Sequence, residues 1–114
     1  MDIDVQESVF QIVRLIPKGR VTSYGAIAQC IGTKQSSRYV GWVLAHSHGV
    51  LPAVPAHRVV NRIGLLTGKH HFDTPTLMQE LLEAEGIRVV GDRVSEFAVL
   101  FWNPMQEIYY ENNL

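Results

Sequence analysis

The most reactive side chains in this sequence are one thiol and five imidazoles. Cys30 is the only cysteine, and it falls late in a predicted helix, where a buried and inert thiol is the usual case. His46 and His48 form one close pair of histidines, and His70 and His71 form another. Neither pair has the cysteine cluster or the helical His-x-x-x-His spacing of a metal site. We therefore expect no metal, no cofactor and no catalysis by Cys30.

A second group with chemical potential joins two distant segments. Glu85 falls in the last turn of a predicted helix, where its negative charge opposes the helix dipole. A compensating partner is expected there, and His57 or Arg58 could supply it. Such a contact predicts a bracing role for His57 and Glu85 rather than a reactive one.

Three helices are predicted in the first half of the chain, where they would position these groups. Apolar residues recur at helical spacing from residue 5 to residue 16, with Asp4 as the candidate N-cap. Ser23 can cap a second helix over residues 24–30 that stops near Gly32, and Ser36 or Ser37 can cap a third over residues 38–46. The short turn between the last two helices is typical of a helix-turn-helix.

The second half of the chain predicts one more long helix and short β pieces. Thr74 can cap the helix, with Pro75 at its first position and Gly86 just past its end. Residues 57–60 are predicted to form a short strand followed by a turn, which together would make a small wing. Residues 87–94 are predicted to form a second short hairpin. Ser95 can cap a brief helix that runs through Phe101. The predicted fold class is mainly α, strictly α+β with short β pieces, in the form of a winged helix-turn-helix.

Length and composition predict a single domain. The 114 residues suit one domain over residues 1–114, with a core over about 5–104 and a loose tail from Met105 to Leu114. The longest stretch without charged residues, 39–57, contains two prolines and two glycines and could not cross a bilayer as a helix. The acidic N-terminus and the lone cysteine favour the reducing cytoplasm, and we expect a monomer that makes no contact with membranes.

The charges are segregated along the sequence although the net charge is only −1. Residues 8–72 carry eight lysines and arginines, all five histidines and no acidic residue, whereas residues 73–114 carry eight acids and two bases. A basic segment of this kind, if it forms one face, is suited to binding phosphates. The alternative is that the acidic half folds over the basic half and cancels it.

Four sequence blocks in a fixed order resemble a known family. They are residues 23–25 (Ser-Tyr-Gly), 37–41 (Ser-Arg-Tyr-Val-Gly), 55–60 (Pro-Ala-His-Arg-Val-Val) and 82–86 (Leu-Glu-Ala-Glu-Gly). Their order and spacing resemble the DNA-binding and active-site domain of the O6-alkylguanine-DNA alkyltransferases, whose signature is Pro-Cys-His-Arg-Val. The resemblance covers residues 5–104. It implies a domain that binds double-stranded DNA.

The departure from that signature changes the implied function. Ala56 stands where the alkyltransferases carry their acceptor cysteine, and a methyl group has no lone pair with which to attack an alkyl carbon. The sequence thus resembles the alkyltransferase-like proteins, which bind O6-alkylguanine without repairing it and pass it to nucleotide excision repair. Family members often have tryptophan at this position. Alanine leaves more room, so bulkier O6 substituents should fit, although an aromatic contact is lost.

The resemblance also implies DNA-binding roles. Arg38 matches the family's arginine finger, which enters the stack from the minor groove and offsets the cost of flipping a guanine, about a few kcal/mol. Tyr24 matches the tyrosine that presses on the phosphate of the target nucleotide. Ser36 and Ser37, with the free amides of the third helix, imply a neutral phosphate cradle, and Thr22 is placed in the same DNA-binding set.

The implied lesion pocket lies beside Ala56. His57 and Glu85 match a pair that activates the cysteine in catalytic relatives, and here they would support the pocket. Thr67 and Gly68 fall in the place of the family's substrate-covering loop. The family's hinge asparagine has no clear match. The pocket predicted on this basis is lined by Tyr24, Pro55, Ala56, His57, Arg58, Thr67 and Gly68.

Two other function classes are compatible with the same fold. A sequence-specific helix-turn-helix regulator would need polar base-reading side chains along the third helix, and the segment after Arg38 is poor in them. A protein-interaction module could use an exposed surface around Trp42 or Trp102. Indifference to DNA would favour the interaction module.

Overall fold

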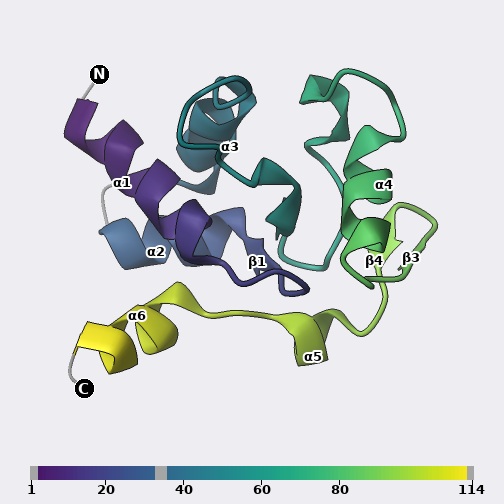
Figure 1. Ribbon diagram of the computed structural model, residues 1–114. Helices are drawn as coiled ribbons and strands as arrows, with labels where there is room; N and C mark the ends of the chain where they lie inside the picture. The colour runs from purple at the N-terminus through teal and green to yellow at the C-terminus, as the bar shows by residue number, and fades with distance from the viewer. Residues whose placement is uncertain (1–2, 33–35, 113–114) are drawn as a thin grey trace.

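The protein is described by a computed structural model that covers residues 3–32 and 36–112 (Figure 1). The predicted turn residues 33–35 lie outside the described residues. The described part is mainly helical, as the sequence predicts, and measures 34 × 31 × 24 Å. Its helices are α1 (Ile3–Leu15), α2 (Tyr24–Ile31), α3 (Ser37–Ala45), α4 (Leu77–Ala84), α5 (Phe97–Leu100) and α6 (Pro104–Asn112), with 3-10 turns η1 (Ala56–Arg58) and η2 (Lys69–His71).

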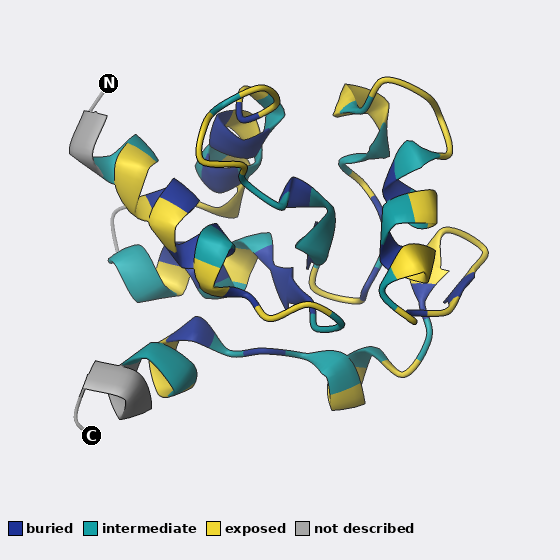
Figure 2. Cartoon of the chain, viewed as in Figure 1, coloured by how far each residue is buried: buried dark blue, intermediate teal, exposed yellow. Residues whose placement is uncertain are grey.

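The helix pair α2–α3 forms as the sequence predicts. Ser23 Oγ accepts a hydrogen bond from the Ala26 amide at 3.1 Å, and Ser36 Oγ accepts one from the Tyr39 amide at 3.0 Å. Both serines are therefore N-caps, and each satisfies an amide that the helix leaves free. Helices α1, α2 and α3 pack against one another around one buried apolar cluster (Figure 2), whose fully buried members include Val9, Val13, Ile27 and Val40.

Three predicted helix starts are wrong. Asp4 lies inside α1 rather than at its cap. Thr74 does not cap α4, because residues 75 and 76 form a turn and the helix begins at Leu77. Helix α5 begins at Phe97 after Glu96, whose left-handed backbone (φ 58°) takes the place of the predicted cap at Ser95.

The strands are β1 (Thr22–Ser23), β2 (Val59–Val60), β3 (Val89–Val90) and β4 (Arg93–Val94). The hairpin β3–β4 is antiparallel and confirms the prediction for residues 87–94. The predicted wing at residues 57–64 is wrong in detail. His57 and Arg58 belong to η1 instead of a strand, and β2 pairs in parallel with β1, with Thr22 opposite Val59. This pairing fixes the segment after Ala56 beside the start of α2.

The C-terminal segment is more ordered than predicted. Residues 104–112 form α6, which packs against α2, and Ile108 contacts the first apolar cluster. Trp102 is only 3% exposed and belongs to that cluster, so it cannot form the exposed contact surface suggested for it. Residues 104–112 are helical because Ile108 packs against the apolar cluster of α1–α3.

A second apolar cluster lies beneath α4. Its buried members come mainly from α4, β2 and the hairpin, and include Val60, Met78, Leu82 and Val94. Phe72 packs against both clusters and so links the two halves of the structure. No helix among residues 3–32 and 36–112 is long and apolar enough to span a membrane.

Candidate nucleic-acid interface

The N-terminal ends of α2 and α3 open onto a shared surface groove of about 300 Å³. Tyr24 starts α2, and Ser37 and Arg38 start α3. The segment before and through η2 closes the opposite side. The full lining is Tyr24, Ser37, Arg38, Gly41, Thr67, Gly68 and His71. The groove thus brings together five residues that the sequence predicts for DNA or lesion contact: Tyr24, Ser37, Arg38, Thr67 and Gly68.

Arg38 is exposed at the edge of this groove. Its guanidinium makes no hydrogen bond or ion pair with the rest of the described chain. Ser36 and Ser37 are also exposed beside it, at the end of α3 where backbone amides are free. Positive charge, hydroxyls and free amides at a helix N-terminus form a surface suited to phosphate.

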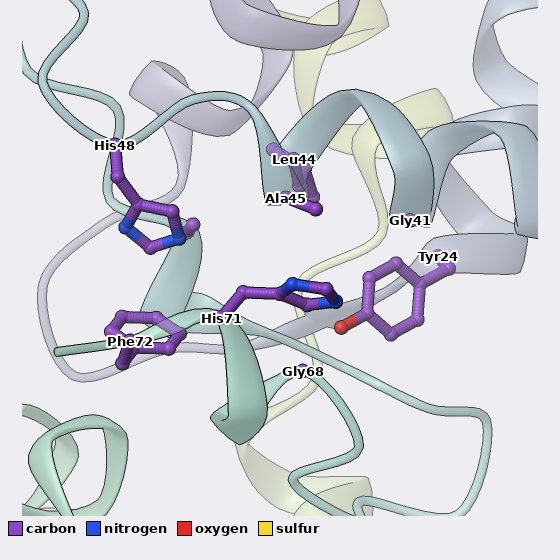
Figure 3. Close-up of a pocket in the computed structure, with 9 residues that line it drawn as sticks. Tyr24, Gly41, Leu44, Ala45, His48, Gly68, His71 and Phe72 are labelled. Atoms are coloured by element: carbon purple, nitrogen blue, oxygen red, sulfur yellow. The ribbon is translucent and has the colours of Figure 1, made fainter. Parts of the chain in front are cut away.

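A small cavity lies behind the groove, between α3 and the η2 segment (Figure 3). Its volume is about 20 Å³, which holds about one water molecule. Tyr24 and His71 stand at one side, and Figure 3 shows the His71 imidazole directed toward the tyrosine ring. The remaining lining residues are Gly41, Leu44, Ala45, His48, Ala56, Gly68 and Phe72. A purine does not fit in this volume, so a base could enter only if these walls move apart.

Tyr24 is held in the wall by two neighbours. A Cβ atom on residue 68 would stand 2.6 Å from Tyr24 Oη, so glycine at this position permits the close approach of the hydroxyl. Burial raises the pKa of Tyr24, and a hydrogen bond with the Thr67 side chain works against that rise. The phenol is therefore neutral over the physiological range and available as a hydrogen-bond donor.

Ala56 lies at the boundary between the cavity and a second groove. The second groove has a volume of about 330 Å³ and also contains Val54, His57 and Leu77. His48 and Phe72 line both spaces, and their rings pack edge to face with centroids 4.7 Å apart. A substituent directed at Ala56 would therefore face an open groove behind this ring pair rather than a closed wall.

Behind η1, a buried cluster ties three segments together. Glu85, the C-cap residue of α4, accepts hydrogen bonds from His57 Nε2 at 2.6 Å and from Arg58 Nη2 at 2.8 Å. Its other oxygen accepts from the Gly19 amide at 2.9 Å, and Arg58 Nη1 also donates to the Ile16 carbonyl at 2.8 Å. The sequence expectation that Glu85 needs a partner is confirmed, and both candidate partners serve.

The electrostatics of the cluster make it a brace. Burial pushes the pKa of Glu85 upward, but the hydrogen bonds from Arg58, the Gly19 amide and His57 outweigh it and hold the pKa at about 2. Burial lowers the pKa of His57, and the contact with Glu85 offsets this only in part. The carboxylate is thus charged and His57 neutral near neutral pH, so His57 Nε2 donates to Glu85. No described thiol lies beside this pair.

Several predicted site residues lie elsewhere. Thr22 is completely buried, so its predicted contact with DNA is wrong: its strand pairs with β2 inside the molecule. Pro55 and Arg58 do not line the cavity, because Arg58 turns away toward Glu85. Thr67 lines the outer groove only. His57 lines the second groove instead of the cavity.

Six wall residues of the cavity were not among the predicted site residues. They are Gly41, Leu44 and Ala45 on one face of α3, His48 in the turn after it, and His71 and Phe72. This spacing was a usable signal once residue 41 was placed in a DNA-binding block. No local pattern in the sequence reveals that η2 turns His71 toward Tyr24.

Among the described residues, the acidic half of the chain forms ion pairs with the basic half at only a few points. Glu85 neutralises Arg58, and Asp92 accepts from Lys69 Nζ at 2.6 Å. Neither contact reaches Arg38. The groove-side face of α3 therefore keeps its positive charge among the described residues, as a phosphate-binding surface requires.

Cys30 and the histidine pairs gain no chemical role from the structure. Cys30 lines a separate groove of about 510 Å³ between α1, α2 and α6, and burial raises the pKa of its thiol. A raised pKa leaves less of the reactive thiolate. Within the part of the chain that the structure describes, no three histidine, cysteine or acidic side chains gather as a metal site would need.

Comparison with known proteins agrees with this geometry. Residues 4–87 match the family described as the 6-O-methylguanine DNA methyltransferase DNA-binding domain. The chain is 41% identical over 102 residues to the DNA base-flipping protein of Escherichia coli, which covers 85% of this chain and 73% of that protein. It is 30% identical over 100 residues to alkyltransferase-like protein 1 of Schizosaccharomyces pombe, covering 84% of this chain and 92% of that protein.

A solved structure and an enzyme complete the comparison. The crystal structure of S. pombe Atl1 in complex with damaged DNA containing O6-carboxymethylguanine matches with a TM-score of 0.75 and 30% identity, over 90% of this chain and 98% of that chain. A methylated-DNA–protein-cysteine methyltransferase of Mycobacterium tuberculosis is 42% identical over 90 residues, covering 78% of this chain and 52% of the enzyme. Relatives of both kinds, alkyltransferase-like and enzymatic, thus share this fold.

Proposed function

Because the chain belongs to the family of the 6-O-methylguanine DNA methyltransferase DNA-binding domain, we propose that it is a non-enzymatic sensor of O6-alkylguanine in double-stranded DNA. It binds the duplex through the minor groove with α3, turns the alkylated guanine out of the stack and holds it beside Ala56. The observation that carries this proposal is the alanine itself, which lines the cavity where the family's acceptor cysteine would stand.

The front of the molecule supplies the binding groups. Arg38 is exposed at the start of α3, and its guanidinium makes no hydrogen bond or ion pair with the described chain. It can therefore enter the base stack where the flipped base leaves. Ser36, Ser37 and the free α3 amides meet phosphates, and Tyr24 stands between them and the cavity. Minor-groove entry suits a protein that must find damage in any sequence, because the minor groove distinguishes bases poorly.

The narrow cavity fits a pocket that widens on binding. Its volume of about 20 Å³ excludes a base, and the η2 segment with His71 and Phe72 forms one wall. Thr67 and His71 are exposed and can shift without uncovering the core, whereas Phe72 packs against both apolar clusters and keeps its place. Turning out the base and displacing this wall are then parts of the same step.

No alkyl transfer follows from this geometry. Residue 56 carries no nucleophile, so the hydrogen-bonded pair of His57 and Glu85 has no thiol beside it to activate. The second groove beyond Ala56 gives room for O6 substituents larger than methyl. The complex would therefore persist, which suits a protein that marks lesions for nucleotide excision repair proteins.

The described chain acts as one domain in this proposal. Phe72 contacts both apolar clusters, so the DNA-facing helices and the bracing helix α4 move as a unit. Residues 105–112 belong to this unit through α6.

The experiment is a titration of the full chain into matched duplexes that contain guanine or O6-methylguanine. We expect tighter binding to the alkylated duplex, and affinity for both that falls as salt is added, because phosphate contacts release counterions. Equal affinity for the two duplexes would contradict lesion recognition. Binding that does not respond to salt would contradict the DNA-binding surface as a whole.

A further inference from the structure

Two aromatic side chains, Trp42 and His46, lie on the exposed side of α3, one and two helical turns beyond Arg38. Residues 38, 42 and 46 are spaced by four and share one face of the helix, and all three are exposed. Trp42 keeps 45% of its surface exposed, which is unusual for the largest apolar side chain. It plays no part in the lesion cavity, whose lining comes from another face of α3.

The indole is held in place by its neighbours. The His46 ring packs against it with centroids 4.4 Å apart and planes tilted by 39°, and the Tyr39 ring lies on the other side at 6.3 Å and 18°. His46 Nδ1 donates to the Trp42 carbonyl at 2.8 Å, which satisfies a carbonyl near the end of the helix. A ring fixed before binding loses little conformational entropy when a partner covers it.

The surroundings of Trp42 favour a polyanion as that partner. Helix α3 carries no acidic residue, and the chain has none from Ser8 to Phe72. The other large apolar side chains that are exposed in the described chain lie on other segments, so Trp42 is not the centre of an apolar patch on its helix. A protein contact would need such a patch, whereas the backbone of a duplex presents phosphates that basic and polar groups contact.

We propose that Trp42, supported by His46, is a second DNA contact on α3, lying against the sugar-phosphate backbone of the duplex about 6 Å along the helix from Arg38. This inference rests on the proposed function, since α3 must face the minor groove. Arg38 and Trp42 then have separate roles in binding. Arg38 replaces the flipped base and gives the lesion preference, and Trp42 adds affinity for any duplex.

The chain offers a built-in optical test, because its other tryptophan, Trp102, is 3% exposed. Iodide quenching of the full chain therefore reports mainly on Trp42. We expect saturating amounts of either duplex, alkylated or not, to reduce iodide access by at least about half. Trp42→Phe, which removes the exposed indole signal, identifies the source of the change.

Affinity measurements complete the test. Trp42→Ala should weaken binding to both duplexes by a similar factor and leave the ratio between them unchanged. Trp42→Phe, which keeps a ring, should lose less. Thermal unfolding of both variants should match that of the unaltered chain, since the indole lies outside the core.

Failure of this inference and failure of the proposed function give different results. If the unaltered chain prefers the alkylated duplex while Trp42→Ala binds as tightly and iodide access does not change, the Trp42 contact is overturned and Trp42 is left for a protein partner. If the chain binds both duplexes equally and Trp42 is still protected, the Trp42 contact stands and the lesion sensor fails. Loss of the lesion preference in Trp42→Ala alone would overturn the division of roles.

Discussion

The two sides of Ala56 differ in how fully their polar groups are bonded. Behind it, the Glu85 carboxylate accepts from His57, Arg58 and the Gly19 amide, and its side chain is only 8% exposed. In front of it, Arg38 and His71 are exposed, and the cavity between the two sides is closed by packing alone. Behind Ala56, the Glu85 carboxylate is fully hydrogen-bonded within the protein. In front of it, the Arg38 guanidinium is exposed and free to bind a partner.

This difference separates stability from binding. Groups whose hydrogen bonds are complete in the free protein can offer little to a ligand, but their loss leaves buried charge unpaired. Groups that are exposed and unbonded add little to folding and are free to bind. His57 and Glu85, which match the activating pair of the enzymes, are bonded to each other here, and Glu85 also accepts from Arg58.

The largest effect should follow from breaking the rear network. Glu85→Ala leaves the Arg58 guanidinium buried without its carboxylate, and should lower the free energy of unfolding by about 3 to 5 kcal/mol. Urea unfolding measures it. Glu83→Ala, an exposed carboxylate on the same helix, is the matched control and should cost less than about 0.5 kcal/mol. A similar loss in both variants would contradict the bracing role.

The same network predicts a pH dependence of stability. Glu85 has a pKa of about 2 in the folded chain against 4.5 in the unfolded chain, so its contribution is complete above pH 4.5 and is lost as the pH falls toward 2. The lowered pKa of His57 adds a loss that begins as the pH falls below 6.5. Unfolding free energies across this range should fall less steeply in Glu85→Gln than in the unaltered chain. Parallel profiles would argue against a charged Glu85.

On the front side, Arg38→Ala should weaken binding to the O6-methylguanine duplex by roughly 1 to 3 kcal/mol, because the gap left by the base is no longer filled. Arg62→Ala is the control for loss of one exposed positive charge, and it should leave the lesion preference unchanged. Stability should not change in either variant. Lesion affinity that survives in Arg38→Ala would remove the finger assignment.

The smallest effect should come from the tyrosine hydroxyl. Tyr24→Phe keeps the ring in the cavity wall but removes the group that bonds Thr67 and that would meet the target phosphate. We expect lesion binding to weaken by about 1 kcal/mol, the usual size of one hydrogen bond. Direct titration against both duplexes measures it. An equal loss on both duplexes would mean that the hydroxyl contacts the backbone of any duplex and not specifically the phosphate of the flipped nucleotide.

The sequence predicted the elements whose signals are local. Helices α2 and α3 formed with Ser23 and Ser36 as caps, because a serine before an apolar run specifies the start of a helix without help from the rest of the chain. The contact between Glu85 and His57 was also predictable, since a carboxylate at a helix C-terminus needs a partner.

The errors arose where distant segments decide the structure. Thr22 looks like a surface residue in sequence, but its strand is buried by parallel pairing with β2, which no local pattern encodes. Residues 105–112 look like a loose tail in sequence, and they are helical because Ile108 packs against the apolar cluster of α1–α3. His71 joined the cavity wall for the same reason, through the fold of η2 against α3.

The most direct test of the account is the fate of the alkyl group. A duplex with a radiolabelled O6-methyl group is held with excess protein until binding is complete, and the mixture is then separated under denaturing conditions. A non-enzymatic sensor leaves all the label with the DNA, while the M. tuberculosis methyltransferase run in parallel carries label on protein. Label on this protein would contradict the account and direct attention to Cys30, with Cys30→Ser as the variant that decides it.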